Sequence, residues 1–393
     1  MNISTLFFTF LKKEAFFIDI VSDVCYNFLK LLSLEVFIML QEMLTERRIR
    51  EIDDFDAASW AQVRESYKSI LFNEVYGLPV PEPTKVEFEV VKTAPKYAAG
   101  AATRYDVMAH TVVCGKEFSF PFIAVIPNKP GKHPFFIHND FDALVPSKYT
   151  PAEEIINNGF GVLSLCYESI TSDNNDFTSG LAGILYPDGV RKNDNDPGKI
   201  AMWAWANMRV MDYALTLNRL DPDQAAIVGH SRLGKTALVT GMLDERFRYV
   251  ISNESGCSGA AITRGKVGET VAQITMRFPY WFCHNYLKYI DHEALTFDQH
   301  MLIATAAPRT VLVGSAIEDQ WADPDSEYLA CVAASKAWKN LGGKGFVGPD
   351  RLPVVGADFR EGDICYHLRG GSHFFSRHDW ICYMNTIREK MGK

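Results

Sequence analysis

Residues 226–235 read AIVGHSRLGK, an apolar run that leads directly into Ser231 and then into residues that favour helix. The pattern predicts a strand over 225–230 and a helix over 233–243, joined by a turn that begins at Gly229. A serine in such a turn occupies the position of a nucleophile elbow, where its Oγ is exposed at the carboxyl end of a sheet. Gly234 stands one residue later than the second glycine of the common G-x-S-x-G spacing. Ser231 could instead only cap the following helix, but the strand before it favours the nucleophile.

Apolar strands alternate with helices on both sides of this motif. The predicted strands span 133–139, 159–167, 225–230, 249–253, 310–315 and 365–368, and the predicted helices span 151–158, 200–220, 233–243, 326–341 and 380–390. Helix 200–220 is expected to be amphipathic, with Trp203, Trp205, Met208 and Met211 at helical spacing. Continuous apolar strands between helices are typical of a mostly parallel sheet covered on both faces. The sequence therefore predicts an α/β-hydrolase fold, a three-layer sandwich with helices on both faces of the sheet.

The domain organisation follows from the same pattern. Residues 1–44 are treated as an N-terminal extension of uncertain status, and residues 45–393 as one catalytic domain with an insertion around 257–300, where the alternation is interrupted. From about Glu46 the chain is predicted to be helical as far as a proline-rich connector at 78–83. Three β-like runs then follow, over 85–92, 105–114 and 118–127, and their alternation favours antiparallel strands.

Composition and charge exclude several classes of protein. Of the 393 residues, 47% are hydrophobic and 22% charged, which excludes a wholly disordered chain. The net charge of −8 and the absence of a basic run longer than Arg47-Arg48 with Arg50 argue against a nucleic-acid partner. No apolar stretch reaches 18 residues, so no transmembrane segment is predicted. Residues 1–44 lack the order of a signal peptide, because Lys12-Lys13 follow the first apolar cluster; this favours a cytoplasmic location, and a monomer is expected.

The eight cysteines show no metal-binding or disulfide framework. They stand at 25, 114, 166, 257, 283, 331, 365 and 382, and no two form a CxxC pair. Most lie in apolar runs, so buried free thiols are expected. Because clusters of histidine and cysteine with ligand spacing are absent from the sequence, neither a metal nor another cofactor is predicted.

A serine nucleophile needs a base, normally a histidine that a carboxylate orients. His373 follows the last predicted strand through a glycine turn, which is the expected position of the base, and His378 is the second candidate. Asp319 follows strand 310–315 and Glu254 follows strand 249–253, so either carboxylate could reach the imidazole from the same edge of the sheet. Glu318, Asp323 and Asp325 are interpreted as solvated loop charges.

Several ordered motifs between residues 60 and 390 carry a family resemblance. They are GHSRLGK (229–235), SNESGCSGAA (252–261), GETV (268–271), FPYWF (278–282), DQH (298–300), APR (307–309), EDQWADP (318–324) and YHLRGGSH (366–373). With these motifs the chain resembles the bacterial branch of the glucuronoyl esterases, carbohydrate esterase family fifteen. The resemblance implies a serine esterase that cleaves esters of glucuronic acid on xylan fragments.

The resemblance also implies roles for individual residues. Ser231 matches the nucleophile, His373 the base, Glu254 the acid of the fungal relatives and Asp319 the acid of many bacterial ones, so the role of the acid stays open between them. Arg232 matches an arginine that helps to hold the oxyanion, and Lys235, Glu269 and Trp321 match residues that contact the uronate. Fungal members flank the nucleophile and the histidine with cysteines that form a disulfide; His230 and Phe374 occupy those positions in this chain.

Other functions remain compatible with the same residues. A deacetylase of acetylated xylan or a general carboxylesterase would use the same triad, and only the shape of the pocket would separate them. A carbohydrate-binding pseudoenzyme is the alternative from another class. The residues that the reaction needs are all present, which favours the enzyme.

Overall fold

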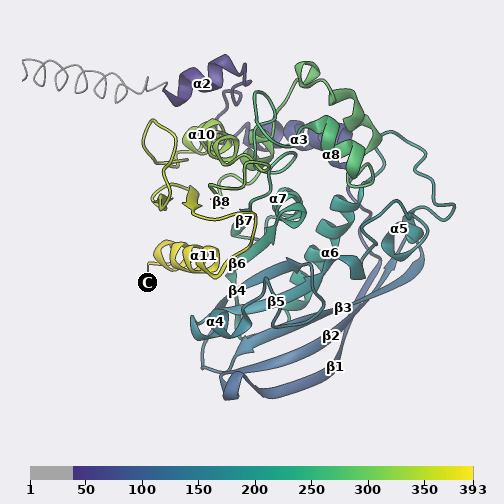
Figure 1. Cartoon of the computed structure of the whole chain (residues 1–393). Coiled ribbons are helices and arrows are strands. Elements are labelled where there is room, and N and C mark those ends of the chain that lie inside the picture. Colours follow the sequence, from purple (N-terminus) through teal and green to yellow (C-terminus); the bar gives the residue numbers. More distant parts are fainter. Residues whose placement is uncertain (1–38, 393) are drawn as a thin grey trace, which may run out of the picture.

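A computed structural model describes residues 39–392 and is built around one ten-stranded sheet (Figure 1). The strand order is β1-β2-β3-β5-β4-β6-β7-β8-β10-β9. Strands β5, β4, β6, β7, β8 and β10 are parallel, whereas β1 to β3 join as antiparallel neighbours and β9 closes the other edge. This mostly parallel sheet with helices on both faces is the α/β-hydrolase fold that the sequence predicts.

The strands are β1 (Lys85–Tyr97), β2 (Ala102–Val113), β3 (Lys116–Pro127), β4 (His133–Asp140), β5 (Gly161–Cys166), β6 (Leu220–His230), β7 (Tyr249–Asn253), β8 (Thr310–Ala316), β9 (Asp358–Phe359) and β10 (Ile364–Arg369). The α-helices are α2 (Leu40–Glu46), α3 (Trp60–Leu71), α4 (Ala152–Asn157), α5 (Gly180–Leu185), α6 (Lys199–Ala214), α7 (Arg232–Leu243), α8 (Val271–Arg277), α9 (His300–Ala304), α10 (Pro324–Asn340) and α11 (Arg377–Lys390). Short helical turns lie at Phe72–Tyr76, Ala98–Gly100, Tyr167–Ser169, His284–Tyr289 and His292–Ala294.

Alternate side chains of the central strands enter two separate cores. On β6, Ala226 and Val228 pack against α4 and α11, whereas Ile227 faces the opposite core, which contains α6, α7 and α10. On β8, Leu312 belongs to the first core and Val311 to the second. Because successive side chains of a strand point to opposite faces, fully apolar strands fill both layers. Figure 1 shows α11 and α4 apart from α6 and α7 in this arrangement.

Helix α6 differs from the predicted helix over 200–220 in two ways. It ends at Ala214, because the chain turns and Leu220 already pairs with His133 at the start of β6. It is also buried on nearly all sides and therefore is not amphipathic. Its outward aromatic side chains meet the long antiparallel strands, which the local pattern could not reveal: Trp205 packs on Phe118 and Phe120, and Tyr213 on Phe88 and Phe122.

The N-terminal region is less helical than predicted. Helix α2 spans the predicted boundary at residue 44, and its Leu40 and Leu44 are buried; the rest of the predicted extension, residues 1–38, lies outside the described residues. Residues 47–59 are not helical, because Arg48 adopts a φ of 53° and Asp56 and Ser59 form a turn through mutual hydrogen bonds. Helix α3 begins only at Trp60.

The segment 257–300 lies between β7 and β8 in the chain, although these two strands are neighbours in the sheet. It contains α8, and its Trp281, Phe282 and Tyr286 are buried in the larger core. The segment is therefore packed on the sheet domain and is part of the same hydrophobic core.

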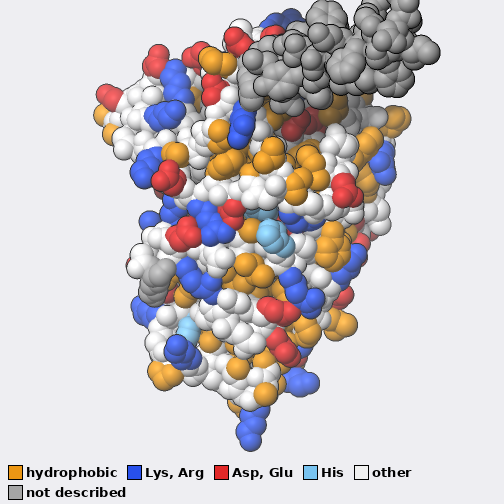
Figure 2. Space-filling view, turned by 60° about the vertical axis from the view of Figure 1, so that its left-hand side comes forward, with side chains coloured by type: hydrophobic (Ala, Val, Ile, Leu, Met, Phe, Trp, Pro, Cys, Tyr) orange, Lys and Arg blue, Asp and Glu red, His pale blue; other side chains and the backbone are white. Residues whose placement is uncertain are grey.

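The surface of the described residues mixes charged and apolar side chains, and their cysteines are unpaired. On the face in Figure 2, basic and acidic side chains are intermixed and small hydrophobic groups lie between them. Among residues 39–392, no helix combines the length and apolar character that crossing a bilayer requires. All seven cysteines in the described part of the chain are free: five are buried as predicted, Cys166 is half-buried and Cys114 is exposed.

Replacing Gly229 by alanine tests the close contact between β6 and α7. A Cβ at this position would overlap the carbonyl group of Leu233, and the crossing of strand and helix would have to open. We expect Gly229→Ala to lower the free energy of unfolding by about 1–3 kcal/mol, as overpacking does. Urea denaturation followed by circular dichroism measures the change.

Gly370→Ala is the matched control, because a Cβ there would approach only Val355 Cγ1, at 3.7 Å. Equal unfolding midpoints for the two variants would contradict the importance of the close crossing.

Candidate active site

Ser231 lies in a strained turn between β6 and α7. Its φ of 58° and ψ of −126° turn the chain sharply after His230, and α7 begins at the next residue, Arg232. The Ser231 N–H donates to the carbonyl of Asn253 at 2.9 Å, and the N–H of Gly234 donates to the Ser231 carbonyl at 2.9 Å. A non-glycine residue with positive φ is uncommon and persists only where neighbouring contacts enforce it. This is the geometry of the nucleophile elbow that the sequence predicts.

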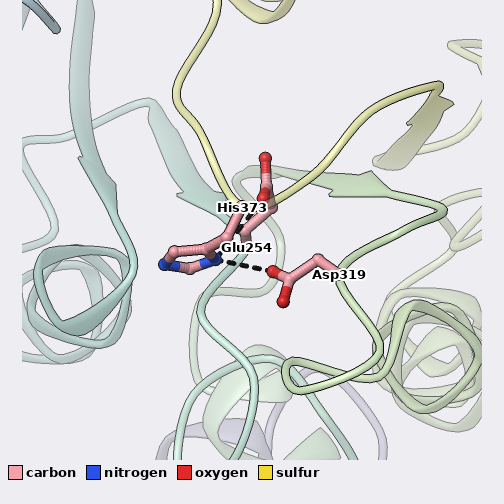
Figure 3. Close-up of side chains that lie close together, drawn as sticks. All are labelled: Glu254, Asp319 and His373. Atoms are coloured by element: carbon pink, nitrogen blue, oxygen red, sulfur yellow. Dashed lines mark hydrogen bonds and ion pairs between the residues drawn. The ribbon is translucent and has the colours of Figure 1, made fainter.

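The carboxyl ends of β7, β8 and β10 place three predicted residues at the same edge. Glu254 directly follows β7, Asp319 lies three residues after β8, and His373 lies four residues after β10. Strands β6, β7, β8 and β10 run parallel and lie side by side in that order, so their carboxyl ends share the edge of the sheet that carries Ser231. Figure 3 shows the three side chains converging from separate segments.

Asp319 is the nearest carboxylate to the imidazole. His373 Nδ1 lies 2.6 Å from Asp319 Oδ2 and 3.5 Å from Glu254 Oε2 (Figure 3). The Glu254 carboxylate has other partners: Oε1 accepts a hydrogen bond from Arg369 Nη2 at 2.5 Å, and Oε2 accepts one from the Phe374 N–H at 3.1 Å. Asp319 therefore makes the hydrogen bond to the ring, and Glu254 binds the loop that carries it.

The electrostatics of the three groups favour a charged imidazole. Burial alone would lower the pKa of His373, but the hydrogen bonds and charges of Asp319 and Glu254 outweigh it and raise the pKa to about 9. Burial would raise the pKa of Asp319, yet the bond to His373 and its positive charge leave that pKa lowered. Burial dominates at Glu254 and raises its pKa to about 7, against the opposing influence of His373 and Arg369.

Arg232 is held by an acid and three aromatic rings, of which the third is Phe141 at 5.7 Å. Its Nη1 forms an ion pair with Asp173 Oδ2, and its guanidinium lies over the rings of Trp281, at 4.7 Å, and Phe278, at 5.4 Å. Asp173 also accepts hydrogen bonds from Trp281 Nε1 at 2.7 Å and from Tyr167 OH at 3.0 Å. Asp173 could not be singled out from the sequence, because it stands in a polar loop with no motif around it.

The remaining predicted residues line one cavity together with the serine and the histidine. The cavity measures about 400 Å³ and is lined by Ser231, Arg232, Lys235, Glu254, Ser255, Gly256, Glu269, Arg277, Phe278, Trp281, Trp321, Ala322 and His373. Lys235 is buried and its ammonium donates to the Ser255 carbonyl. The Glu269 N–H donates to the Trp321 carbonyl at 3.0 Å, which joins these two residues on one wall. Arg277, Phe278 and Trp281 come from the segment 257–300 and were not predicted.

Three acids near Asp319 are interpreted from the sequence as solvated loop charges, and they differ in how much of each is exposed. Glu318 is exposed and Asp325 half-buried, but Asp323 is buried and that interpretation is wrong. Asp323 begins α10 with a φ of 69°, accepts a hydrogen bond from the Ser326 N–H at 3.0 Å and another from the Val267 N–H at 2.7 Å. Its carboxylate is needed as a helix cap, which explains its burial.

Glu327 is a second buried acid that the sequence did not single out. Its carboxylate accepts hydrogen bonds from Ser315 Oγ at 2.5 Å and from the Gly256 N–H at 2.9 Å, and burial raises its pKa to about 8. It therefore ties the loop after β7 to β8 beneath the cavity. His378, the second candidate for the base, is exposed on α11, where its Nε2 lies 3.5 Å from Cys382 Sγ.

His230 and Phe374 pack as aromatic groups beside the histidine. The ring centroids of His230 and His373 are 4.5 Å apart, and Tyr149 lies 5.3 Å from both His230 and Phe374. His230 Nδ1 lies 2.7 Å from Asn253 Oδ1. A cluster of tilted rings therefore surrounds His373 at the two positions, 230 and 374.

Within residues 39–392, one group of potential metal ligands comes close together, and it consists of Glu254, Asp319 and His373. Ligand atoms of Glu254, Asp319 and His373 lie within 4.8 Å of one another. Two carboxylates and an imidazole can bind a divalent cation, but the Arg369 guanidinium already pairs with Glu254, and His373 Nδ1 is engaged with Asp319. The contacts of this donor set fit a hydrogen-bonded triad better than a metal centre.

The fold and the elbow together define the chain as an α/β-hydrolase. A family model described as "Glucuronyl esterase, fungi" matches residues 111–342, more than half of the sequence. The chain is 41% identical over 244 residues to the "carbohydrate esterase MZ0003" of an unknown prokaryotic organism, which covers 61% of this chain and 55% of that protein. It spans about half the length of the curated relatives it matches.

Two solved structures are similar over most of the chain. A glucuronoyl esterase from Solibacter usitatus has a TM-score of 0.78 and 30% identity, with 85% of this chain and 94% of that chain covered. A promiscuous CE15 esterase from the marine bacterial metagenome has a TM-score of 0.76 and 31% identity, with 85% and 92% covered. The chain belongs to the glucuronoyl esterases, carbohydrate esterase family 15, on the bacterial branch of that family.

The proton affinity of His373 should depend chiefly on Asp319. Because an adjacent negative charge stabilises the imidazolium, Asp319→Asn should lower the pKa of His373 from about 9 toward its ordinary value. Glu254→Gln should lower it less, since Glu254 is 3.5 Å away and shares its charge with Arg369. NMR titration of labelled histidine, assigned with His373→Gln, measures both shifts.

Glu318→Gln, an exposed neighbour of Asp319, is the control and should leave the pKa of His373 unchanged. Equal shifts for the Asp319 and Glu254 variants would mean that the two carboxylates share the imidazole. A raised histidine pKa also stabilises the folded state fully below about pH 6.5, and this contribution disappears as the pH rises through about 9. The unfolding free energies of wild type and Asp319→Asn should therefore differ more at pH 6 than at pH 10.

Proposed function

We propose that this protein hydrolyses esters of glucuronic acid on xylan fragments through an acyl-enzyme at Ser231. The observation that supports the proposal most directly is a single cavity that is lined both by the catalytic residues and by residues suited to binding a sugar. Ser231 and His373 line it beside Arg232, and Lys235, Glu269 and Trp321 line it as well. A hydrolytic group and a set of polar and aromatic groups suited to a sugar therefore meet in one space.

The reaction starts from the neutral form of His373, whose fraction grows as the pH rises toward its pKa of about 9. In the proposed first step, Ser231 Oγ attacks the ester carbonyl and the unprotonated Nε2 of His373 takes the hydroxyl proton. The resulting imidazolium is stabilised by the hydrogen bond from Nδ1–H to Asp319, which is 2.6 Å long. The ester bond to the alcohol breaks, the alcohol leaves with the proton from His373, and the uronoyl group stays on Ser231. A water molecule, deprotonated by His373, then attacks the acyl-enzyme and releases the acid and the free serine.

Negative charge on the carbonyl oxygen develops near the start of α7. The backbone N–H of Arg232 lies at this helix N-terminus, where the helix dipole favours an anion. The Arg232 guanidinium adds a positive charge that Asp173 and the rings of Trp281 and Phe278 hold in place. Donors fixed before the reaction stabilise the transition state without a cost of reorganisation, and losing one costs roughly 3–4 kcal/mol in comparable hydrolases.

We assign the role of the orienting acid to Asp319. Its oxygen is the closer one to His373 Nδ1, and its lowered pKa keeps it ionised through the neutral range. Glu254 Oε2 lies 3.5 Å from the same nitrogen, but the Glu254 carboxylate accepts its hydrogen bonds from Arg369 and from the Phe374 N–H. Glu254 then supports the histidine loop, and because burial raises its pKa to about 7 its negative charge is only partly developed at neutral pH.

Selectivity for a uronate is proposed to come from Lys235, Glu269 and Trp321, which line the same cavity. Glu269 is buried, its side chain faces the cavity, and the Lys235 ammonium is nearby, so the pair offers an acceptor and donors for sugar hydroxyl groups. The indole of Trp321 is 45% exposed and offers a flat face to a sugar ring. Acetyl esters need none of these contacts.

A broader carboxylesterase is the second candidate. The His373 side chain is 44% exposed, and Trp321 is equally open, so the mouth of the cavity does not enclose a substrate closely. One of the similar solved structures is described as a promiscuous esterase. An open mouth tolerates different alcohol groups, whereas the acyl side would still meet Lys235 and Glu269.

The nucleophile is tested with wild type and Ser231→Ala on benzyl glucuronate and 4-nitrophenyl acetate. Loss of the attacking oxygen should reduce kcat by about a thousandfold or more on both substrates. A preference of the wild type for the glucuronate would support the proposed substrate, and turnover of acetate alone would favour the broader esterase. Full activity of Ser231→Ala would overturn the mechanism, and an inactive wild type that binds glucuronoxylan fragments would favour the pseudoenzyme.

The uronate wall is tested with Glu269→Gln. Because a hydrogen bond to a buried charged group contributes about 1.5–3 kcal/mol, kcat/KM for benzyl glucuronate should fall about 10- to 100-fold. Turnover of 4-nitrophenyl acetate should fall much less, and steady-state kinetics on the two substrates gives the ratio. The exposed Glu318→Gln serves as the control for both; a parallel loss on both substrates in Glu269→Gln would argue against a role in selectivity.

A further inference from the structure

Arg369 lies immediately behind the histidine loop and is not part of the cavity lining. It is the last residue of β10, four positions before His373, and it is buried, with 8% of its surface exposed. The loop 370–376 leaves the sheet at Arg369, carries His373 and ends where α11 begins. A long charged side chain buried at this point needs a set of partners, and the structure provides them.

The guanidinium donates to three backbone carbonyls of the loop. Nη1 donates to the Gly370 carbonyl at 2.9 Å, and Nη2 donates to the Ser372 carbonyl at 3.1 Å and to that of Phe374. Ser372 and Phe374 are the two neighbours of His373. The arginine therefore holds the backbone on both sides of the histidine from inside the loop.

Two buried carboxylates complete the contacts of this side chain. Arg369 Nε lies 3.0 Å from Asp379 Oδ2, and Nη2 lies 2.5 Å from Glu254 Oε1. Asp379 is on the first turn of α11 and accepts the Ser376 N–H at 2.7 Å, so it fixes the far end of the loop. Glu254 fixes it a second time by accepting the Phe374 N–H.

The planar fork of arginine is suited to this arrangement in a way that lysine is not. Its N–H groups point in fixed directions and can serve carbonyls and carboxylates at once, whereas an ammonium is a compact point charge with three rotatable donors. The loop has further contacts, because the Glu318 N–H donates to the Gly371 carbonyl at 3.1 Å and Phe375 is buried, but Arg369 is the side chain that binds the carbonyls on both sides of His373.

We infer that Arg369 is a positioning residue for His373: by binding the carbonyls on both sides of the histidine and joining Glu254 to Asp379, it sets the place of the imidazole against Asp319. It touches neither substrate nor reacting atoms. This inference rests on the proposed function for its kinetic consequence only, because the position of the ring can be observed without turnover.

The test compares Arg369→Met and Arg369→Lys with wild type by NMR and by kinetics. The readout that does not depend on activity is the downfield resonance of the His373 Nδ1–H, which reports the hydrogen bond to Asp319 and is assigned with His373→Gln. We expect it to be lost or strongly broadened in Arg369→Met. The kcat for benzyl glucuronate should fall by about 100-fold, the loss expected for a small misplacement of a reacting group. KM should change little, because Arg369 does not line the cavity.

Arg360→Met is the matched control, since Arg360 also joins two carboxylates, Asp358 and Glu389, in the C-terminal part of the chain. It should keep both the resonance and the kcat. If Arg369→Met does not fold, Arg369→Lys decides, because it keeps the charge between Glu254 and Asp379 but loses the fork. We expect it to fold, with a weakened resonance and reduced kcat.

A retained Nδ1–H resonance with a kcat within twofold of wild type in either folded Arg369 variant would overturn the inference. So would an equal loss of kcat in Arg369→Met and Arg360→Met. The wild type could also lack esterase activity on every ester tested while the Arg369 variants lose the resonance. That result would overturn the proposed function and leave the positioning role supported.

Discussion

The close crossing of β6 and α7 is the constraint on which the rest of the site depends. Gly229 lets the strand approach the carbonyl of Leu233, and the chain between them can turn only if Ser231 adopts a positive φ. That strained conformation is held by the hydrogen bond from the Ser231 N–H to the Asn253 carbonyl at the end of β7. The next residue after Asn253 is Glu254. The contact that fixes the serine therefore also sets where the first carboxylate leaves the sheet.

Buried charges around the edge of the sheet occur in matched sets. Asp173 pairs with Arg232, Asp319 with His373, and Arg369 with both Glu254 and Asp379. Burying such pairs contributes little net stability, because the loss of hydration offsets the attraction. Breaking one leaves an uncompensated charge, and that penalty is what restricts each side chain to a single position. The positions of the site's side chains are therefore fixed by the free-energy penalty of separating these pairs. Most of the stability of the fold comes from the two apolar cores.

Local patterns in the sequence are sufficient to predict the positions of the central strands and helices. Strand β7 has the predicted bounds, and the elbow, α7 and β10 differ by only one or two residues, because apolar runs and glycine turns determine them within a short window. The burial of α6 could not be predicted, since the aromatic residues that cover Trp205 come from β3, about 90 positions earlier.

The same limit applies to the polar residues of the site. The sequence brought Ser231, His373, Asp319 and Glu254 to one edge, but it left the choice between the two acids open, because that depends on distances of 2.6 and 3.5 Å. Asp173, Glu327 and Arg369 acquire their meaning from partners on other elements. Asp323 was misread because an acid in a loop is usually solvated, and only the start of α10 shows that this one is a cap.

The close contact between the rings of His230 and His373 imposes a further electrostatic condition. His230 lies 4.5 Å from the His373 ring, and an imidazolium cannot stack on a second imidazolium without strong repulsion. Burial, together with the charge of His373, lowers the pKa of His230 to about 3, so this ring stays neutral while His373 holds its proton. A neutral aromatic face restrains the tilt of the imidazole, and the two carboxylates act at its Nδ1. The edge that carries Nε2 is left for the proton of Ser231, which is the arrangement that a base acting twice in one cycle requires.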